Sequence, residues 1–307
     1  MTAMTDRCRR RFVLSTILAL AAGAFVAGCG DDDEDTAASD APEPISFQIT
    51  ATAEGAKQKA LEFPTSIKAG LVEITLRNED KAPRSAQIIR VEGDHTVDDV
   101  LKIVDAEEET KIPTWMQDGG GLGSVKPGAS ATATQVLAPG KYVVWDDEGG
   151  DEGPGNSELG AKGEFTVTGP AVDVELPARE ATVTATDEGE GEDKTYDFEF
   201  AGLKAGTNEV RFENTGDELH HALFFPMRQG ATIKEVEEAF AAEEEPEGPP
   251  PVDFMNGVGT TVIDGGIAQN ISLDLKAGKY AVVCFISDRE GGPPHAAKGM
   301  LKELTVE

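Results

Sequence analysis

The chain contains an internal repeat, which constrains its fold more than any other sequence feature. Residues 45–169 follow the same plan as residues 173–307. The offset is 136 residues at the matched Asn positions and 138 at the matched Tyr positions, as loop insertions would produce. We therefore expect two related domains. The matching stretches are Lys68–Asn78 with Lys204–Asn214, Gly140–Val144 with Gly278–Val282, and Ala161–Gly163 with Ala297–Gly299.

Each copy has the pattern of a small β-sandwich. Short runs of β-branched and apolar residues alternate with turn residues, which predicts strands. Each copy also contains one short helix that begins with a capping box, formed by Thr96 with Asp99 in the first copy and by Thr232 with Glu235 in the second. We predict an all-β chain of two tandem Greek-key β-sandwich domains, each with one short helix.

The N-terminal 28 residues are typical of an export signal. Arginines up to Arg11 precede the apolar run 12–28, which ends in small residues. Val26–Cys29 resembles a bacterial lipobox, in which the cysteine is lipidated, so residues 1–28 are predicted to be a lipoprotein signal peptide. An ordinary signal peptide or an N-terminal membrane helix is the alternative, although the run is short for a span. The arginine pair ahead of Phe12 also resembles a twin-arginine signal.

Residues 29–44 form an acidic segment that cannot bury a core, and we interpret them as a flexible tether. Lipid on Cys29 would place the protein in the cell envelope, at the outer face of the cytoplasmic membrane or in the periplasm. The formal charge of −30 makes nucleic acid a poor partner. We interpret this charge mainly as a source of solubility, and a basic redox protein is the partner that it would attract. We expect a monomer.

Cys284 is the only thiol left once the signal peptide is removed and Cys29 is lipidated. It has no partner for an intrachain disulfide in an oxidising compartment. It lies on the predicted strand 280–286, and His295 and Met300 follow on the return from a loop rich in Gly and Pro. Thiolate, imidazole and thioether in this order suit copper cycling between Cu(I) and Cu(II). An inert buried cysteine on a core strand is the alternative.

A second histidine would complete this ligand set, and the adjacent His220 and His221 are the candidates. His220 follows Asn214 by six residues, the same spacing as that between Asn78 and Arg84 in the first copy. Strand alternation sends the two histidines to opposite faces, and both faces carry apolar residues. We prefer His220 on position and keep His221 as the fallback.

These elements resemble the cupredoxins, the blue copper family that includes plastocyanin. The family pattern is a strand ending Asn-x-Gly-x-x-Pro-His, then Gly-x-Tyr, then Cys, His and Met before a final strand. The resemblance covers roughly residues 173–307 and implies one type 1 copper ion in the C-terminal domain, with Met300 as its axial ligand. Leu219 departs from the family's usual Pro, and the ten residues between Cys284 and His295 make a longer loop than in plastocyanin. The matching residues are Asn214, Gly216, His220, Gly278, Tyr280, Cys284, His295 and Met300.

The first copy lacks this ligand set. Alignment across the repeat places Arg84, Asp146, Leu159 and Glu164 at the positions of the four ligands. Residues 45–169 are therefore predicted to form a degenerate, metal-free domain of the same fold.

We favour an exported, lipid-anchored copper-binding protein that transfers one electron at a time. A metal-free interaction module of the cell envelope is the alternative. Enzymes of the multicopper oxidase or nitrite reductase kind need further copper centres made of histidines, and this chain has four histidines in all. We therefore predict that it is not an enzyme. In the family, the histidine of the Cys–His loop lies near the surface, so we expect His295, in an uncharged stretch, to be the electron port.

Overall fold

The computed structural model describes residues 43–106, 111–149, 153–189, 191–242 and 248–307. The predicted signal peptide, the lipidation site Cys29 and the tether as far as residue 42 lie outside the described residues. Within the described ranges, no helix is both long enough and apolar enough to cross a membrane.

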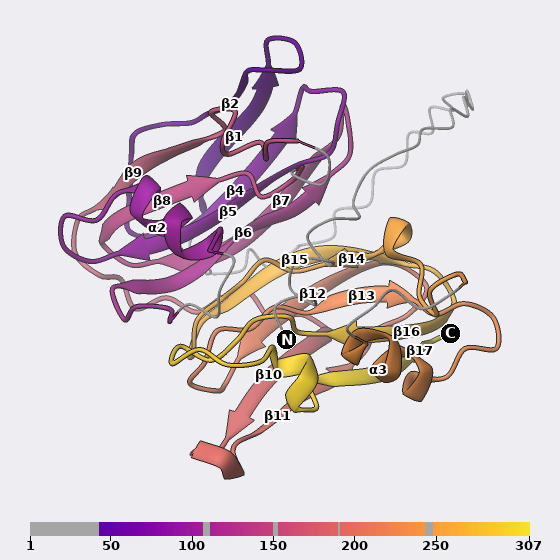
Figure 1. The fold of residues 1–307 in the computed structure, drawn as a ribbon. Coiled ribbons are helices and arrows are strands. Elements are labelled where there is room, and N and C mark those ends of the chain that lie inside the picture. The colour runs from indigo at the N-terminus through magenta and orange to yellow at the C-terminus, as the bar shows by residue number, and fades with distance from the viewer. Residues whose placement is uncertain (1–42, 107–110, 150–152, 190, 243–247) are drawn as a thin grey trace, which may run out of the picture.

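The described chain is mostly β-structure, as predicted, and its two halves have the same plan (Figure 1). The first half contains β1 (Ile45–Ala53), β2 (Lys59–Glu62), β3 (Ser66–Lys68), β4 (Gly70–Asn78), β5 (Arg84–Val91), α2 (Val97–Val104), β6 (Met116–Val125), β7 (Ser130–Leu137), β8 (Gly140–Trp145) and β9 (Lys162–Thr168). The second half contains β10 (Ala181–Glu188), β11 (Thr195–Ala201), β12 (Gly206–Asn214), β13 (Leu223–Pro226), α3 (Ile233–Ala241), β14 (Val258–Gly259), β15 (Ala268–Leu275), β16 (Gly278–Val283) and β17 (Leu301–Val306). Short 3-10 turns at Gly191–Asp193, Phe254–Asn256 and His295–Lys298 complete it.

One sheet is shared by both halves. Its strand order is β11-β10-β12-β15-β7-β4-β1-β2, so each half contributes four strands. The second sheet of the first half has the order β3-β9-β8-β5-β6, and that of the second half has the order β14-β13-β16-β17. Corresponding strands of the two halves therefore occupy corresponding places, as the sequence repeat requires.

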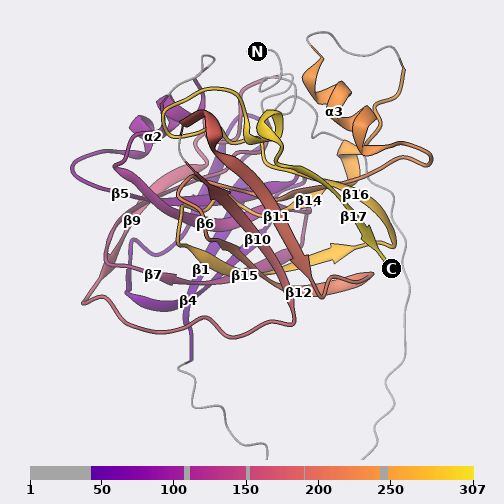
Figure 2. The same ribbon diagram turned by 90° about the horizontal axis from the view of Figure 1, so that it is seen from below.

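The two halves join where β15 pairs antiparallel with β7. Gln269 lies opposite Gln135, and Ile271 lies opposite Ala133. In Figure 2, β7 and β15 lie in the layer that runs across both halves. Pairing the two strands satisfies the backbone groups that each would expose as the edge of a separate sheet. The prediction of tandem sandwiches did not include this junction.

Alternating apolar side chains build the core between the sheets of each half. In the first half, the ring of Phe165 lies 4.6 Å from that of Phe47 and 5.2 Å from that of Tyr142, centroid to centroid. In the second half, Phe212 and Phe224 are fully buried. Burying a side chain of this size contributes about 1.5 to 3 kcal/mol to stability.

The two predicted helices begin where their capping boxes indicate. Thr96 caps α2 and Thr232 caps α3, and in each case the side chain at the third helical position returns the hydrogen bond to the cap. Val236 and Phe240 of α3 are buried against Phe225 of the second half. Both capping predictions are confirmed.

Candidate metal centre

Backbone hydrogen bonds at the end of β16 bring Cys284, His295 and Met300 together. The strand ends at Val283, so Cys284 is the first residue beyond it, and the predicted strand 280–286 was too long. The Cys284 amide donates to the Met300 carbonyl at 3.2 Å, and the Met300 amide donates to the His295 carbonyl at 2.8 Å. The loop that leaves at Cys284 therefore returns directly beside it.

His220 reaches the same point from the segment that precedes β13. Its amide donates to the Ile263 carbonyl and its carbonyl accepts from the Ile263 amide, both at 2.9 Å. His220 and Cys284 are fully buried in the core of the second half. This backbone pair holds the imidazole over the end of β16.

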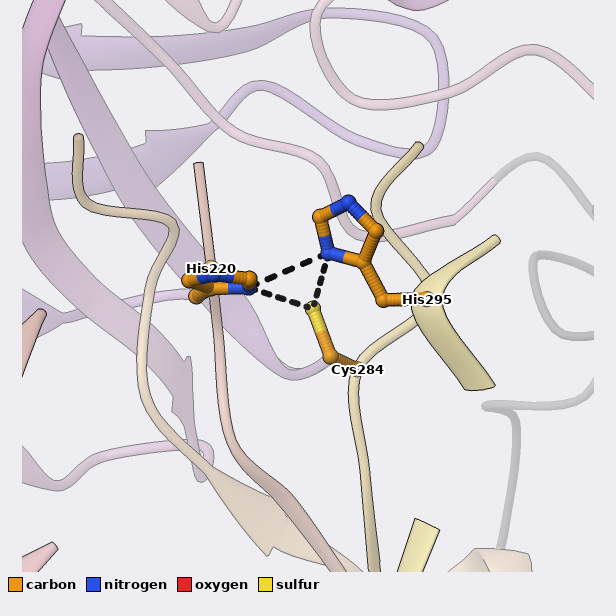
Figure 3. Close-up of side chains that lie close together, drawn as sticks. All are labelled: His220, Cys284 and His295. Carbon is orange, nitrogen blue, oxygen red and sulfur yellow. Dashed lines mark hydrogen bonds between the residues drawn. The ribbon is translucent and has the colours of Figure 1, made fainter. Parts of the chain in front are cut away.

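Three donor atoms converge at this point (Figure 3). The Cys284 Sγ lies 3.7 Å from Nδ1 of His220 and 3.7 Å from Nδ1 of His295, and the two nitrogens are 3.1 Å apart. A point equidistant from all three lies about 2 Å from each, close to the bond lengths of about 2.0 to 2.3 Å between a metal ion and imidazole or thiolate. The cluster therefore fits one metal ion, and its donor types suit copper.

A carboxylate contacts the Nε2 atom of each imidazole, on the opposite side of the ring from the Nδ1 atom that faces the cluster. Nε2 of His220 lies 3.0 Å from Asp187, and Nε2 of His295 lies 2.9 Å from Asp288. A carboxylate accepts a hydrogen bond, so each Nε2 carries the proton and each Nδ1 presents its lone pair to the centre. Neither carboxylate was predicted from the sequence. The position of Asp288 inside the Cys–His loop was the one available signal.

Lysines keep these carboxylates ionised. Lys194 lies 2.8 Å from Asp187, and Lys298 pairs with Asp288. Burial alone would raise the pKa of Asp187, but its hydrogen bonds to His220 and Lys194 lower that pKa below the usual range. The pKa of Asp288 is lowered in the same way, because its bonds from Lys298 and Tyr196 outweigh its burial.

Burial sets the protonation of the donors themselves. It raises the pKa of the Cys284 thiol to about 12, so the thiol stays protonated at neutral pH until a metal displaces the proton. Burial, with repulsion from His220, lowers the pKa of His295 to about 3. This imidazole is therefore neutral and ready to coordinate.

The fallback ligand His221 lies on the other face of its segment. Its Nε2 accepts a hydrogen bond from the Phe285 amide at 2.9 Å, and its ring contacts that of Phe285. Met300, in contrast, is fully buried in the same core cluster as Cys284. The structure therefore places His220 rather than His221 at the cluster, as the spacing from Asn214 predicts.

His295 does not lie at the surface, and the predicted electron port is wrong in this respect. Its side chain is fully buried, with the ring of Tyr196 stacked on it at a centroid distance of 4.5 Å. The Tyr196 hydroxyl donates to Asp288 at 2.6 Å. Tyr196, Lys194 and Lys298 line a pocket of about 330 Å³. The long Cys–His loop lets Asp288 fold back over the imidazole. The number of residues in the loop could not predict this contact.

In the first half, an ion pair occupies the equivalent place. Arg84 and Asp146 stand at the positions of His220 and Cys284, and their side chains are in contact and fully buried. Arg84 also donates to the Thr52 and Ala60 carbonyls, at 2.8 and 3.1 Å.

Two of the predicted equivalences in the first half are wrong. The amide of Asp146 donates to the Ala161 carbonyl and the Ala161 amide donates to the Asn156 carbonyl, the same bonds that link Cys284, Met300 and His295. Asn156 and Ala161, rather than Leu159 and Glu164, therefore stand at the remaining ligand positions. The alignment failed because 297–299 lie in the turn before β17, whereas the similar residues 162–163 lie in β9.

Solved structures of blue copper proteins are similar to this chain. Auracyanin from Roseiflexus castenholzii is 19% identical, with a TM-score of 0.28, over 42% of this chain and 99% of its own. Auracyanin A from Chloroflexus aurantiacus is 17% identical, with a TM-score of 0.29, over 41% and 100%. Copper nitrite reductase from Nitrosomonas europaea is 18% identical, with a TM-score of 0.25, over 86% and 94%. No protein-family model and no curated protein sequence matches the chain.

The chain is mostly β-structure, and it brings a His-Cys-His cluster together at the end of β16. The chain has a cupredoxin-like fold. In this fold, a buried cluster of one thiol and two imidazoles points to a copper-binding site.

The prediction that this cupredoxin-like chain is not an enzyme is wrong. The similar structures include copper nitrite reductase and blue copper oxidase from Nitrosomonas europaea and a multicopper oxidase, all of which are enzymes, beside auracyanin, which is not. A count of histidines was too narrow a basis for excluding catalysis.

Proposed function

We propose that the protein is an exported, lipid-anchored electron carrier with one type 1 copper site. His220, Cys284 and His295 would hold the ion, with Met300 as the axial ligand. The observation that supports this most directly is the convergence of Sγ and two Nδ1 atoms at distances of 3.1 to 3.7 Å. Copper bound there supplies one-electron chemistry between Cu(I) and Cu(II).

The surrounding residues keep the ligands in one arrangement. Asp187 and Asp288 fix the orientation of the two imidazoles, and complete burial keeps water away from Cys284. Ligands held in this way need little rearrangement when the charge at the site changes, which favours rapid electron transfer.

Copper titration of the purified protein tests the proposal. We expect one equivalent to bind and to produce an intense visible band. His220→Ala should lose the band, whereas His221→Gln should keep it, because glutamine can still accept the hydrogen bond from the Phe285 amide. Protein that binds no copper would instead favour a metal-free interaction module.

Tyr196 is the side chain through which we expect a redox partner to reach the site. It stacks on His295 and lines the pocket next to it. Tyr196→Leu removes the ring, and we expect electron exchange with a basic redox protein to become several-fold slower in stopped-flow measurements. Tyr196→Phe is the matched control, because it keeps the ring and loses only the hydroxyl, which donates to Asp288 and accepts from Lys298. Equal rates in all three proteins would exclude this route.

The proposed anchor depends on Cys29. The lipid on this residue would supply the membrane attachment, since the acidic tether itself does not favour a membrane. Cys29→Ala should move the protein from the membrane fraction to the soluble fraction when cells are fractionated. Continued membrane association would indicate an uncleaved helix over residues 12–28.

A further inference from the structure

The seam between the two halves is formed by the chain segments that carry the candidate ligands. Leu219, next to His220, is buried in a cluster with Met116 and Trp145 of the first half. Ile286, two residues after Cys284, packs against the same cluster. The side chains beside two of the three ligands are therefore held by the other half of the molecule.

A buried amide of the first half holds the backbone partner of His220. The Gln87 side chain donates to the Val262 carbonyl at 3.0 Å and accepts from the Val262 amide at 2.9 Å. The next residue, Ile263, forms both backbone hydrogen bonds with His220. Gln87 is thus linked to the His220 backbone through two consecutive residues.

Gly119 allows this close approach. It has a φ of +95°, and a Cβ there would lie 2.5 Å from the Val262 carbonyl oxygen. Packing of the second half therefore leaves no room for a side chain at this one position of β6.

Arg289 makes the second connection, from within the Cys–His loop. Its guanidinium donates to the carbonyls of Pro113 and Met116 in the first half, at 3.1 and 3.0 Å, and to Asp264 at 2.7 Å. Its own amide donates to Glu218 at 2.7 Å, two residues before His220. Arg289 therefore ties the loop that follows Cys284 both to the first half and to the segment that carries His220.

We propose that the metal-free first half is the positioning domain of the candidate copper site, and that Arg289 is its principal positioning residue. The first half holds the segments on either side of the site, so that three donors from two separate segments meet without a metal. This inference rests on the proposed function for the identity of the metal, while the contacts themselves belong to the metal-free chain.

The length of the Cys–His loop gives this role a physical reason. Ten residues separate Cys284 from His295, and ordering a loop of this length costs backbone conformational entropy. The guanidinium contacts are largely shielded from water, since the Arg289 side chain is 17% exposed. Hydrogen bonds to a charged group in such surroundings are stronger than those at an open surface.

The test uses full-length Arg289→Met, which keeps most of the side-chain volume and removes every guanidinium bond. In the metal-free protein, we expect the His220 and His295 amides to exchange with solvent about tenfold faster. In the copper-loaded protein, we expect the EPR spectrum and the visible band to shift. Gln87→Leu should have the same effect on the His220 amide, which provides a second variant if Arg289→Met does not fold.

Lys111→Ala is the matched control. Lys111 pairs with Glu290 across the same seam, but both side chains are mostly exposed, and such pairs contribute little. Exchange and spectra should therefore match the wild type. Unchanged exchange in both Arg289→Met and Gln87→Leu would overturn the positioning role. Faster exchange in a protein that never binds copper would support the positioning role and reject the proposed function.

Discussion

Cys284→Ser is expected to abolish the intense visible absorption of the copper-loaded protein. The band requires charge transfer from a thiolate to Cu(II), and Cys284 carries the thiol of the cluster. A serine hydroxyl is a harder donor and a poorer ligand for Cu(I), so copper should also bind more weakly. Absorption spectra and metal content after dialysis measure both effects.

The fold should survive this change. Serine is close to cysteine in size, and Nδ1 atoms of His220 and His295 remain nearby to accept its hydrogen bond. Circular dichroism should therefore match the wild type, which separates loss of the site from loss of the fold. A Cys284→Ser protein that still showed the band would remove Cys284 from the proposed ligand set.

Asp146→Ala is expected to destabilise the protein by about 3 to 5 kcal/mol, because it leaves the charge of Arg84 buried without its main partner. Both side chains of this pair are fully buried. Asp80 lies 3.2 Å from Arg84 but already pairs with Lys59, so it offsets only part of the loss. Urea denaturation measures the change in the free energy of unfolding.

Two further variants separate charge burial from the general effect of mutation. In Arg84→Met with Asp146→Leu, both charges are gone, and most of the lost stability should return. Asp98→Ala removes an exposed partner of Lys162 in the same half and should cost less than about 1 kcal/mol. If Asp146→Ala cost no more than Asp98→Ala, the ion pair would not be a structural replacement for a metal site.

The sequence by itself determined which residues are the candidate ligands. Cys284, His295 and Met300 were predicted as ligands because a predicted strand and the turn after it bring them close together within a short stretch of chain. The six-residue spacing from Asn214 then favours His220 over the adjacent His221. The capping boxes at Thr96 and Thr232 are equally local. Such features could be predicted because they depend on residues only a few positions apart.

Only the tertiary structure decided what surrounds those ligands. Asp187 is 33 residues from His220, and Arg289 is 176 residues from the Pro113 carbonyl that it binds. No periodic pattern connects residues at such separations, because their contact depends on how sheets and loops pack. The burial of His295 under Tyr196 was mispredicted for the same reason.

The alignment of the two repeats likewise predicted some features of the structure and missed others. It matched Arg84 and Asp146 correctly because strands β5 and β8 set their register by pairing with each other. It failed at Leu159 and Glu164, because the Ala-Lys-Gly match joined the turn before β17 to residues at the start of β9. It could not show that β7 and β15 join the halves into one sheet, since both strands alternate in the way any half-buried strand does. Which edges meet is decided by the shapes of the folded halves.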